Sequence, residues 1–200
     1  MKRGWLIAVG VVVLGALIIM LSVQGTYNGI VSQEQDVNAK WAQVQNVYQR
    51  RADLVPNLVA TVKGYAEHES SVLEEVTNAR SRVGSMQVTS DILNKPAEFQ
   101  KFQQAQAGLQ GALSRLLVVV ERYPDLKANQ NFLELQSQLE GTENRITVER
   151  MRFTESSQQY NTRIKQFPAI LLARFFGFAE KQYFQATAGS ERAPTVDFSK

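Results

Sequence analysis

The feature that most constrains this chain is a run of uncharged residues near its N-terminus. From Gly4 to Gln33 there is no charged side chain, and residues 5–23 (WLIAVGVVVLGALIIMLSV) are almost entirely apolar. A helix rises about 1.5 Å per residue, so residues 5–23 span roughly 28 Å, the thickness of a bilayer's hydrocarbon core. The run therefore predicts one transmembrane helix and argues against a purely soluble enzyme.

A cleaved signal peptide is the alternative to a retained anchor. The apolar run is longer than a usual signal core of about 7–15 residues, and no A-x-A cleavage pattern follows it. We therefore expect a retained signal-anchor. Lys2 and Arg3 precede the run, and no comparable basic cluster follows before Lys40. The positive-inside tendency then places residues 1–4 in the cytoplasm and the domain over 24–187 on the far side of the membrane.

Composition removes several classes of function. Residues 24–200 carry 20 basic and 19 acidic side chains, so the part beyond the span is almost neutral. A nucleic-acid-binding protein usually carries a clear cationic excess, and we expect no nucleic-acid partner. The chain has no cysteine and one histidine, which excludes disulfides, thiol nucleophiles and most zinc sites.

Beyond the span the hydrophobic period is helical, and no segment alternates convincingly like a strand. We predict an all-α fold, in which a single N-terminal transmembrane helix leads into an elongated antiparallel bundle with coiled-coil-like seams. Pro56 lies inside the first long helix and is expected to kink or divide it. The predicted elements are long helices over about 27–84, 96–122 and 124–166, a short helix over 169–184 and a flexible tail over 188–200.

The first predicted helix is much longer than the second, so one bundle cannot cover its whole apolar stripe. We expect part of it to form a stalk continuous with the span and part to pack against another copy of the chain. The partners expected from the sequence are therefore the lipid bilayer, further copies in a homo-oligomer, and other envelope proteins.

Several charged residues lie within or beside the apolar stripes; Glu34 is one, and seven others form a candidate set. One interpretation is that they reach the bundle surface while their stems cover apolar neighbours. The other is that they meet across helices as half-buried pairs, an interhelical polar network that sets the register of the bundle. The seven residues are Arg51, Asp53, Glu69, Arg80, Glu143, Glu149 and Arg150.

The segment 169–184 is rich in large apolar side chains, and Phe175, Phe176 and Phe178 are its candidate interaction surface. Three positions are open to it: the lipid interface, the end of the bundle, or a neighbouring subunit. In a bundle of three antiparallel helices the third runs away from the membrane, which places Phe167 at the distal end. We therefore favour packing within the chain or against a subunit over contact with lipid.

We predict no catalytic residue, metal or cofactor. His68 lies between two glutamates, but neighbouring helical residues point about 100° apart and no second histidine follows four residues later. Paired carboxylates occur at Glu74 and Glu75 and at Glu140 and Glu143, without a nucleophile or a phosphate-binding loop beside them. Solvated helix charges explain them, and we expect no enzymatic activity.

A set of spaced motifs carries a family resemblance. They are 27–28 (YN), Trp41, 48–58 (YQRRADLVPNL), 62–69 (VKGYAEHE), 79–80 (AR), 121–128 (ERYPDLKA), 143–146 (ENRI), Arg150, 160–161 (YN) and 167–168 (FP). Together they resemble the LemA family of bacterial membrane proteins; Phe153-Thr154 departs from the family's more usual Tyr-Asn. The resemblance implies a single-span protein of the bacterial cytoplasmic (inner) membrane, with an extracytoplasmic, periplasmic helical domain and no established enzymatic activity.

These observations lead to one functional prediction and one alternative. The prediction is a non-enzymatic, membrane-anchored helical scaffold that self-associates in the cell envelope, where many weak contacts gain strength through multivalency. The alternative is an accessory or adaptor subunit of a membrane protease or transporter, which presents or restrains a substrate.

Overall fold

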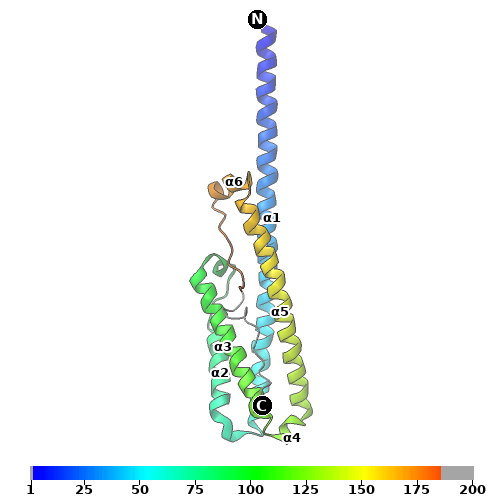
Figure 1. Ribbon diagram of the computed structural model, residues 1–200, viewed down its shortest axis with the longest axis vertical. Helices are drawn as coiled ribbons and strands as arrows, with labels where there is room; N and C mark the ends of the chain where they lie inside the picture. Colours follow the sequence, from blue (N-terminus) through cyan, green and yellow to red (C-terminus); the bar gives the residue numbers. More distant parts are fainter. Residues whose placement is uncertain (1, 186–200) are drawn as a thin grey trace, which may run out of the picture.

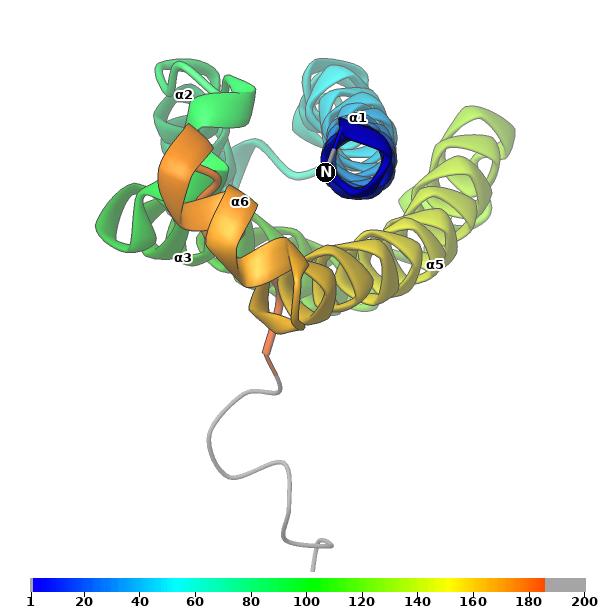
Figure 2. The ribbon, with the colours of Figure 1, turned by 90° about the horizontal axis from the view of Figure 1, so that it is seen from above.

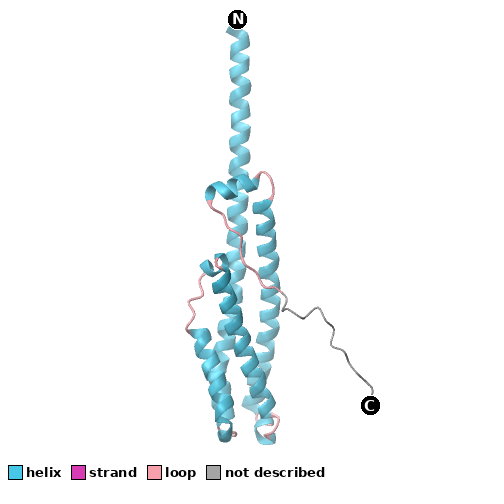
Figure 3. Ribbon diagram, turned by 60° about the vertical axis from the view of Figure 1, so that its left-hand side comes forward, coloured by secondary structure: helices cyan, strands magenta, loops and turns pink. Residues whose placement is uncertain are grey.

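The computed structural model describes residues 2–185, and every regular element in this range is a helix (Figures 1 and 3). The all-α prediction is confirmed, while the tail predicted at 188–200 lies outside the described residues. The elements are α1 (Lys2–Lys63), η1 (Glu67–Glu69), α2 (Ser70–Gly84), η2 (Ser90–Asn94), α3 (Pro96–Val120), α4 (Pro124–Lys127), α5 (Gln130–Lys165) and α6 (Ala169–Phe176).

Helix α1 contains the predicted membrane span and continues without interruption into the domain (Figure 1). Within residues 2–185 it is the one helix that is long and apolar enough to cross a membrane. The large apolar side chains from Trp5 to Val23 are exposed, whereas from Ile30 onward one stripe of the helix is buried against its neighbours. The stalk expected from the sequence is therefore a direct continuation of the span.

The prediction of one helix over 27–84 was wrong in its second half. The helix passes through Pro56, whose ring is exposed, and ends at Lys63. Residues 64–69 then reverse the chain, and α2 packs back against α1 and α3. The apolar period of the sequence continues through this turn almost unchanged, and only Gly64 marks it.

The additional reversal produces four long helices instead of three. α1 and α3 run away from the span, and α2 and α5 return toward it (Figure 1). The stripe predicted over 124–166 is divided into α4 and α5, where the Asn129 side chain caps α5 by accepting a hydrogen bond from the Phe132 N–H (3.1 Å). Phe167 therefore lies at the membrane end of the domain, and the expectation of a distal position was wrong.

The long apolar stripe is covered within one chain. Its members on α1 from Ile30 to Val62 are buried, and so are Val76 and Ala79 on α2. The argument that a surplus stripe requires a second copy of the chain was wrong, because the folding back of α2 and the return of α5 supply the missing partners.

The core has two parts of different composition. The proximal core, nearer the span, combines aromatic side chains of α1, α3, α5 and the C-terminal segment, including Trp41, Phe99, Phe102, Phe153 and Phe184. The distal core is built almost entirely from valine, leucine and alanine, with Phe132 as its one fully buried aromatic residue among those described.

The segment after α5 closes the proximal end. The helix predicted over 169–184 ends at Phe176, because Gly177 adopts a left-handed conformation (φ 77°) that is typical of a helix C-terminus. Residues 177–185, here called the strap, then run back along the bundle without regular structure. The Gln182 N–H donates to the Leu93 carbonyl (2.7 Å), which ties the strap to the segment before α3.

Candidate functional site

The most buried charge in the bundle is Arg51 on α1, whose side chain is almost fully enclosed between the two cores. One guanidinium nitrogen donates to the Glu143 carboxylate on α5 (3.1 Å), and the other donates to the backbone carbonyl (3.1 Å) and side-chain oxygen of Gln106 on α3. The same guanidinium lies 5.0 Å from the ring centre of Tyr48. One side chain therefore joins three helices.

The electrostatics of this site depend on burial. The pKa of Tyr48 is raised mainly by loss of solvent, an effect that the positive charges of Arg150 and Arg51 partly offset and the negative charge of Glu143 reinforces. A buried arginine that loses its partners costs about 3–5 kcal/mol, although the intact pair adds little net stability. The hydrogen bonds of Arg51 thus connect α1 with both α3 and α5.

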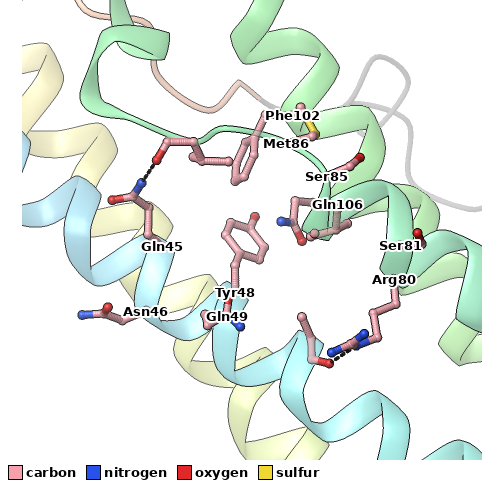
Figure 4. A pocket seen from close by; sticks show the side chains of 14 residues that line it. Gln45, Asn46, Tyr48, Gln49, Arg80, Ser81, Ser85, Met86, Phe102 and Gln106 are labelled. Atoms are coloured by element: carbon pink, nitrogen blue, oxygen red, sulfur yellow. Dashed lines mark hydrogen bonds between the residues drawn. The ribbon is translucent and has the colours of Figure 1, made fainter.

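Two open cavities flank Tyr48. The first, of about 760 Å³, lies between α1, the end of α2 and α3 and is lined by Gln45, Arg80 and Gln106 among others (Figure 4). The second, of about 580 Å³, lies on the side of Glu143 and Arg150. Their polar lining consists mostly of amides and arginines. Among residues 2–185, no three histidine, cysteine, aspartate or glutamate side chains are grouped to hold a metal.

Arg80 explains how α1 passes through Pro56. Proline has no N–H, so the carbonyl of Ala52, four residues earlier, loses its helical partner. The Arg80 Nε on α2 donates to this carbonyl (2.9 Å), as Figure 4 shows. The arginine therefore satisfies the backbone group that Pro56 leaves free and fastens α2 to α1 at the same point.

Glu69 links two turns at the distal end of the bundle. Its carboxylate pairs with Arg122 (3.0 Å) and accepts a hydrogen bond from the Tyr123 hydroxyl (3.2 Å), both just after α3. The turn between α1 and α2 is thereby linked to the turn between α3 and α4.

The remaining members of the predicted network do not join helices in the same way. Asp53 is exposed and accepts a hydrogen bond from Gln49 on its own helix (2.7 Å). Glu149 pairs with Arg152, also within α5 (2.8 Å). The Arg150 guanidinium lies 4.3 Å from the ring centre of Phe184, so its partner is the strap. Of the seven residues, only Arg51 and Glu143 contact each other in an ion pair.

Sequence reasoning missed the contacts that hold the strap. The ammonium of Lys181 donates to Glu34 on α1 (2.6 Å) and to Asn94 (3.0 Å) although the lysine is almost fully buried. Asn161 on α5 bonds both the N–H and the carbonyl of Lys181 (2.9 Å each). The position of Glu34 on an apolar stripe was the available signal, whereas the strap itself has no periodic pattern.

The three phenylalanines predicted as an interaction surface have different environments. Phe178 packs against the proximal core, and Phe176 contacts Tyr27 of α1 with ring centres 4.8 Å apart. Phe175 is 82% exposed. His68, considered for metal binding, is exposed in η1.

Comparison with known proteins gives one family and several distant relatives. A family model described as LemA family matches residues 40–198. The chain is 28% identical over 195 residues to magnetosome protein MamQ of Magnetospirillum gryphiswaldense, a match that covers 90% of this chain and 71% of that protein. It is 27% identical over 175 residues to magnetosome protein MamQ 2 of Paramagnetospirillum magneticum, covering 80% of this chain and 64% of that protein.

A further relative is protein LemA of Metamycoplasma hominis, which is 22% identical over 163 residues and covers 82% of this chain and 70% of that protein. None of these three relatives is named as an enzyme.

Proposed function

The chain belongs to the LemA family, and we propose that it is a non-enzymatic scaffold of the cell envelope, anchored by α1 and able to self-associate. The observation that carries the proposal is the continuity of α1 from the exposed apolar span into the buried core. At about 1.5 Å per residue, residues 24–63 hold the far end of the bundle roughly 60 Å from the end of the span. A rod of this kind sets a distance between the membrane and whatever the domain contacts.

The polar residues of the bundle support a structural role over a catalytic one. Two guanidinium nitrogens of Arg51 bond Glu143 and Gln106, and the Arg80 Nε bonds a backbone carbonyl. The Arg51 Nε has no hydrogen-bond partner but is buried away from the solvent of both cavities. A catalytic group instead needs a free atom directed at a substrate. The cavities beside Tyr48 are open and amide-lined, which suits water better than a reacting molecule.

Placement of the domain outside the cytoplasm rests on Lys2 and Arg3 before the span. The chain has no cysteine, so a single one introduced at exposed Val118 is a specific probe. In intact spheroplasts of a bacterial host, a membrane-impermeant maleimide should label Val118→Cys without lysis. Labelling only after lysis would place the domain in the cytoplasm.

Self-association has a physical basis in the span itself. Gly4, Ala8, Gly15 and Ser22 recur on one side of α1, and small residues allow helices to approach closely in a bilayer. Side chains added at Gly4 or Gly15 would meet no other part of the chain, so this side is open to another helix. Copies joined through their spans would hold their rods parallel.

The test is the mass of the detergent-extracted full chain. We expect a defined assembly for the native chain and smaller species for Gly15→Leu, because leucine separates the helices. Gly10→Leu is the matched control, since Gly10 lies about 140° around the helix from Gly15. An assembly unchanged by Gly15→Leu would contradict association through the span. A native chain that is monomeric in detergent would contradict self-association and favour the accessory-subunit alternative.

A further inference from the structure

One apolar surface of the domain is not used by the bundle. It consists of Phe167, Leu171 and Phe175, which are 80%, 59% and 82% exposed. Leu171 and Phe175 are four residues apart on α6 and share one side of it, and Phe167 lies in the turn just before the helix. These three residues are here called the α6 face. Ala169 and Ala173 on the other side are buried against the domain. Single exposed apolar side chains such as Val118 and Met151 occur elsewhere on the domain, but three grouped at one end form a patch that favours a partner.

The position of α6 identifies the surface it faces. α6 lies across the end of the domain from which the span of α1 emerges (Figures 1 and 2). Tyr27 of α1 contacts Phe176 and Phe178, with ring centres 4.8 Å and 5.7 Å apart. Tyr27 follows Val23, the last residue of the apolar span, by four residues, which is about 6 Å along the helix. α6 therefore sits directly beside the point where α1 leaves the hydrocarbon core.

The charge pattern of α1 places Tyr27, and α6 beside it, in the headgroup region of the bilayer. The uncharged residues from Gly4 to Gln33 span about 45 Å, which equals the bilayer thickness with its headgroups. The first charged residue, Glu34, is bonded to Lys181 inside the domain. The helix thus carries no charge at the level of Tyr27, where α6 contacts it.

The charges around α6 suit a lipid surface. Arg174 is exposed on α6, and Arg163 lies on the last turn of α5. The local acidic residue Glu180 is paired with Lys165 (2.7 Å). An apolar face bordered by cations is typical of segments that lie in the interface of a membrane with anionic lipids.

We propose that the α6 face inserts into the interfacial layer of the same bilayer that α1 crosses, as a second attachment that fixes the tilt of the rod. Three large apolar side chains give weak binding on their own. α1 already holds α6 at the membrane surface, so this weak binding becomes effective through the high local concentration. A second copy of the chain is the less suitable occupant, because three side chains bury far less area than a stable dimer requires.

The absence of cysteine allows a direct test in the full chain. Phe175→Cys is labelled with an environment-sensitive fluorophore and reconstituted in vesicles of phosphatidylethanolamine and phosphatidylglycerol. Val118→Cys is the control, because Val118 is also apolar and exposed (70%) but lies near the distal end of α3. We expect a blue-shifted emission at position 175 and several-fold stronger quenching by lipids with a nitroxide near the top of the acyl chain.

Three other results would overturn the proposal. Equal, water-like emission and equal quenching at positions 175 and 118 would show that α6 stays in solvent. A blue shift at 175 that grows with the protein-to-lipid ratio, without lipid quenching, would assign the face to a second copy. Adding Leu171→Ser to the labelled Phe175→Cys chain should reduce the lipid quenching, and unchanged quenching would contradict insertion of the α6 face. Circular dichroism melting checks that each variant remains folded.

Discussion

The proximal and distal cores are built on the same helices by different means. In the distal core, aliphatic side chains pack between α1, α2, α3 and the first half of α5, which neighbouring turns bring together. In the proximal core, aromatic rings meet around Trp41, whose ring centre lies 5.2 Å from that of Phe153 and 5.3 Å from that of Phe102. Trp41 and Phe153 are 112 residues apart along the chain, and Trp41 and Phe102 are 61 apart.

Because the two cores differ in how far apart their residues lie along the chain, we expect the two halves of the domain to differ in how they fold and open. The distal core forms from consecutive antiparallel helices, whereas the proximal core is complete only when the strap brings Phe184 against Phe153 and Phe99. Contacts between residues distant in sequence require loop closure before they contribute stability. We expect the proximal half, next to the membrane, to open more readily than the distal half.

The largest expected effect is that of Trp41→Ala. Removal of a fully buried tryptophan costs about 3–5 kcal/mol of unfolding free energy, and it should also release the strap. Hydrogen exchange should then accelerate at the amides of Lys181 and Gln182 before it does so in α2. Leu116→Ala in the distal core is the control and should cost about 2–3 kcal/mol. Equal acceleration in both halves would show that the two cores unfold as one unit.

The second effect concerns the boundary between the cores. Arg51→Ala removes the buried guanidinium and leaves the partly exposed Glu143 carboxylate and the Gln106 carbonyl without their donor. It should lower the free energy of unfolding by about 3 kcal/mol, measured by denaturant titration. Lys95→Ala, at an exposed ion pair with Glu98, should change it by less than about 0.5 kcal/mol. The double variant Arg51→Met/Glu143→Leu should recover much of the loss, because methionine fills the space of the arginine side chain and the carboxylate left without a partner is gone. Similar small losses for Arg51→Ala and Lys95→Ala would contradict a register role.

The sequence predicted the helices well because the spacing of apolar residues depends only on residues that are close together along the chain. The span, the start of α3 at Pro96 and the end of α5 before Pro168 all follow from residues near them. The reversal at Gly64 was missed because the apolar spacing continues through it. That one error changed the direction of every later helix, and it put Phe167 at the wrong end.

The candidate site was predictable only in part for the same reason. A charge on an apolar stripe, such as Arg51 or Glu34, marks a position that requires a partner. The identity of that partner depends on which helices become neighbours, so Gln106 and Lys181 were not foreseen. The role of Arg80 depends on a backbone carbonyl, which no residue pattern reveals.

The third effect tests the strap. Lys181→Met removes a buried ammonium that bonds Glu34 and Asn94, and we expect a loss of about 2 kcal/mol. Lys165→Met breaks the exposed pair with Glu180 and should cost less than about 0.5 kcal/mol. The exchange of strap amides should increase only for Lys181→Met. An unchanged strap in that variant would show that Phe184 alone holds it.

The fourth effect belongs to the distal half and tests the link between Pro56 and Arg80. Arg80→Ala should cost about 1–2 kcal/mol, because the Ala52 carbonyl loses its donor. In a Pro56→Ala background the new N–H of residue 56 bonds that carbonyl, so the same substitution should cost about 1 kcal/mol less. The double-mutant cycle, measured by urea unfolding, gives this coupling directly. A coupling of zero would mean that the arginine acts through packing alone.

The smallest expected effect is on stability at alkaline pH, where the proximal and distal cores should again respond differently. Burial raises the pKa of both Tyr48 and Tyr160, which lie in the proximal core. As the pH rises, the two tyrosines therefore ionise in the unfolded chain before they ionise in the folded chain. The stabilisation that the protonated tyrosines contribute is complete below about pH 10, and it is lost as the pH rises toward their pKa values in the folded chain. The double variant Tyr48→Phe/Tyr160→Phe should shift the midpoint of alkaline unfolding upward by a few tenths of a pH unit, whereas Tyr65→Phe at the distal turn should leave it unchanged. Tyr123 at the distal end also has a raised pKa, through desolvation and the nearby Glu69. The decisive chain is therefore Tyr123→Phe, and distal helices that still melt first at high pH in it would contradict the assignment of the weaker half to the membrane side.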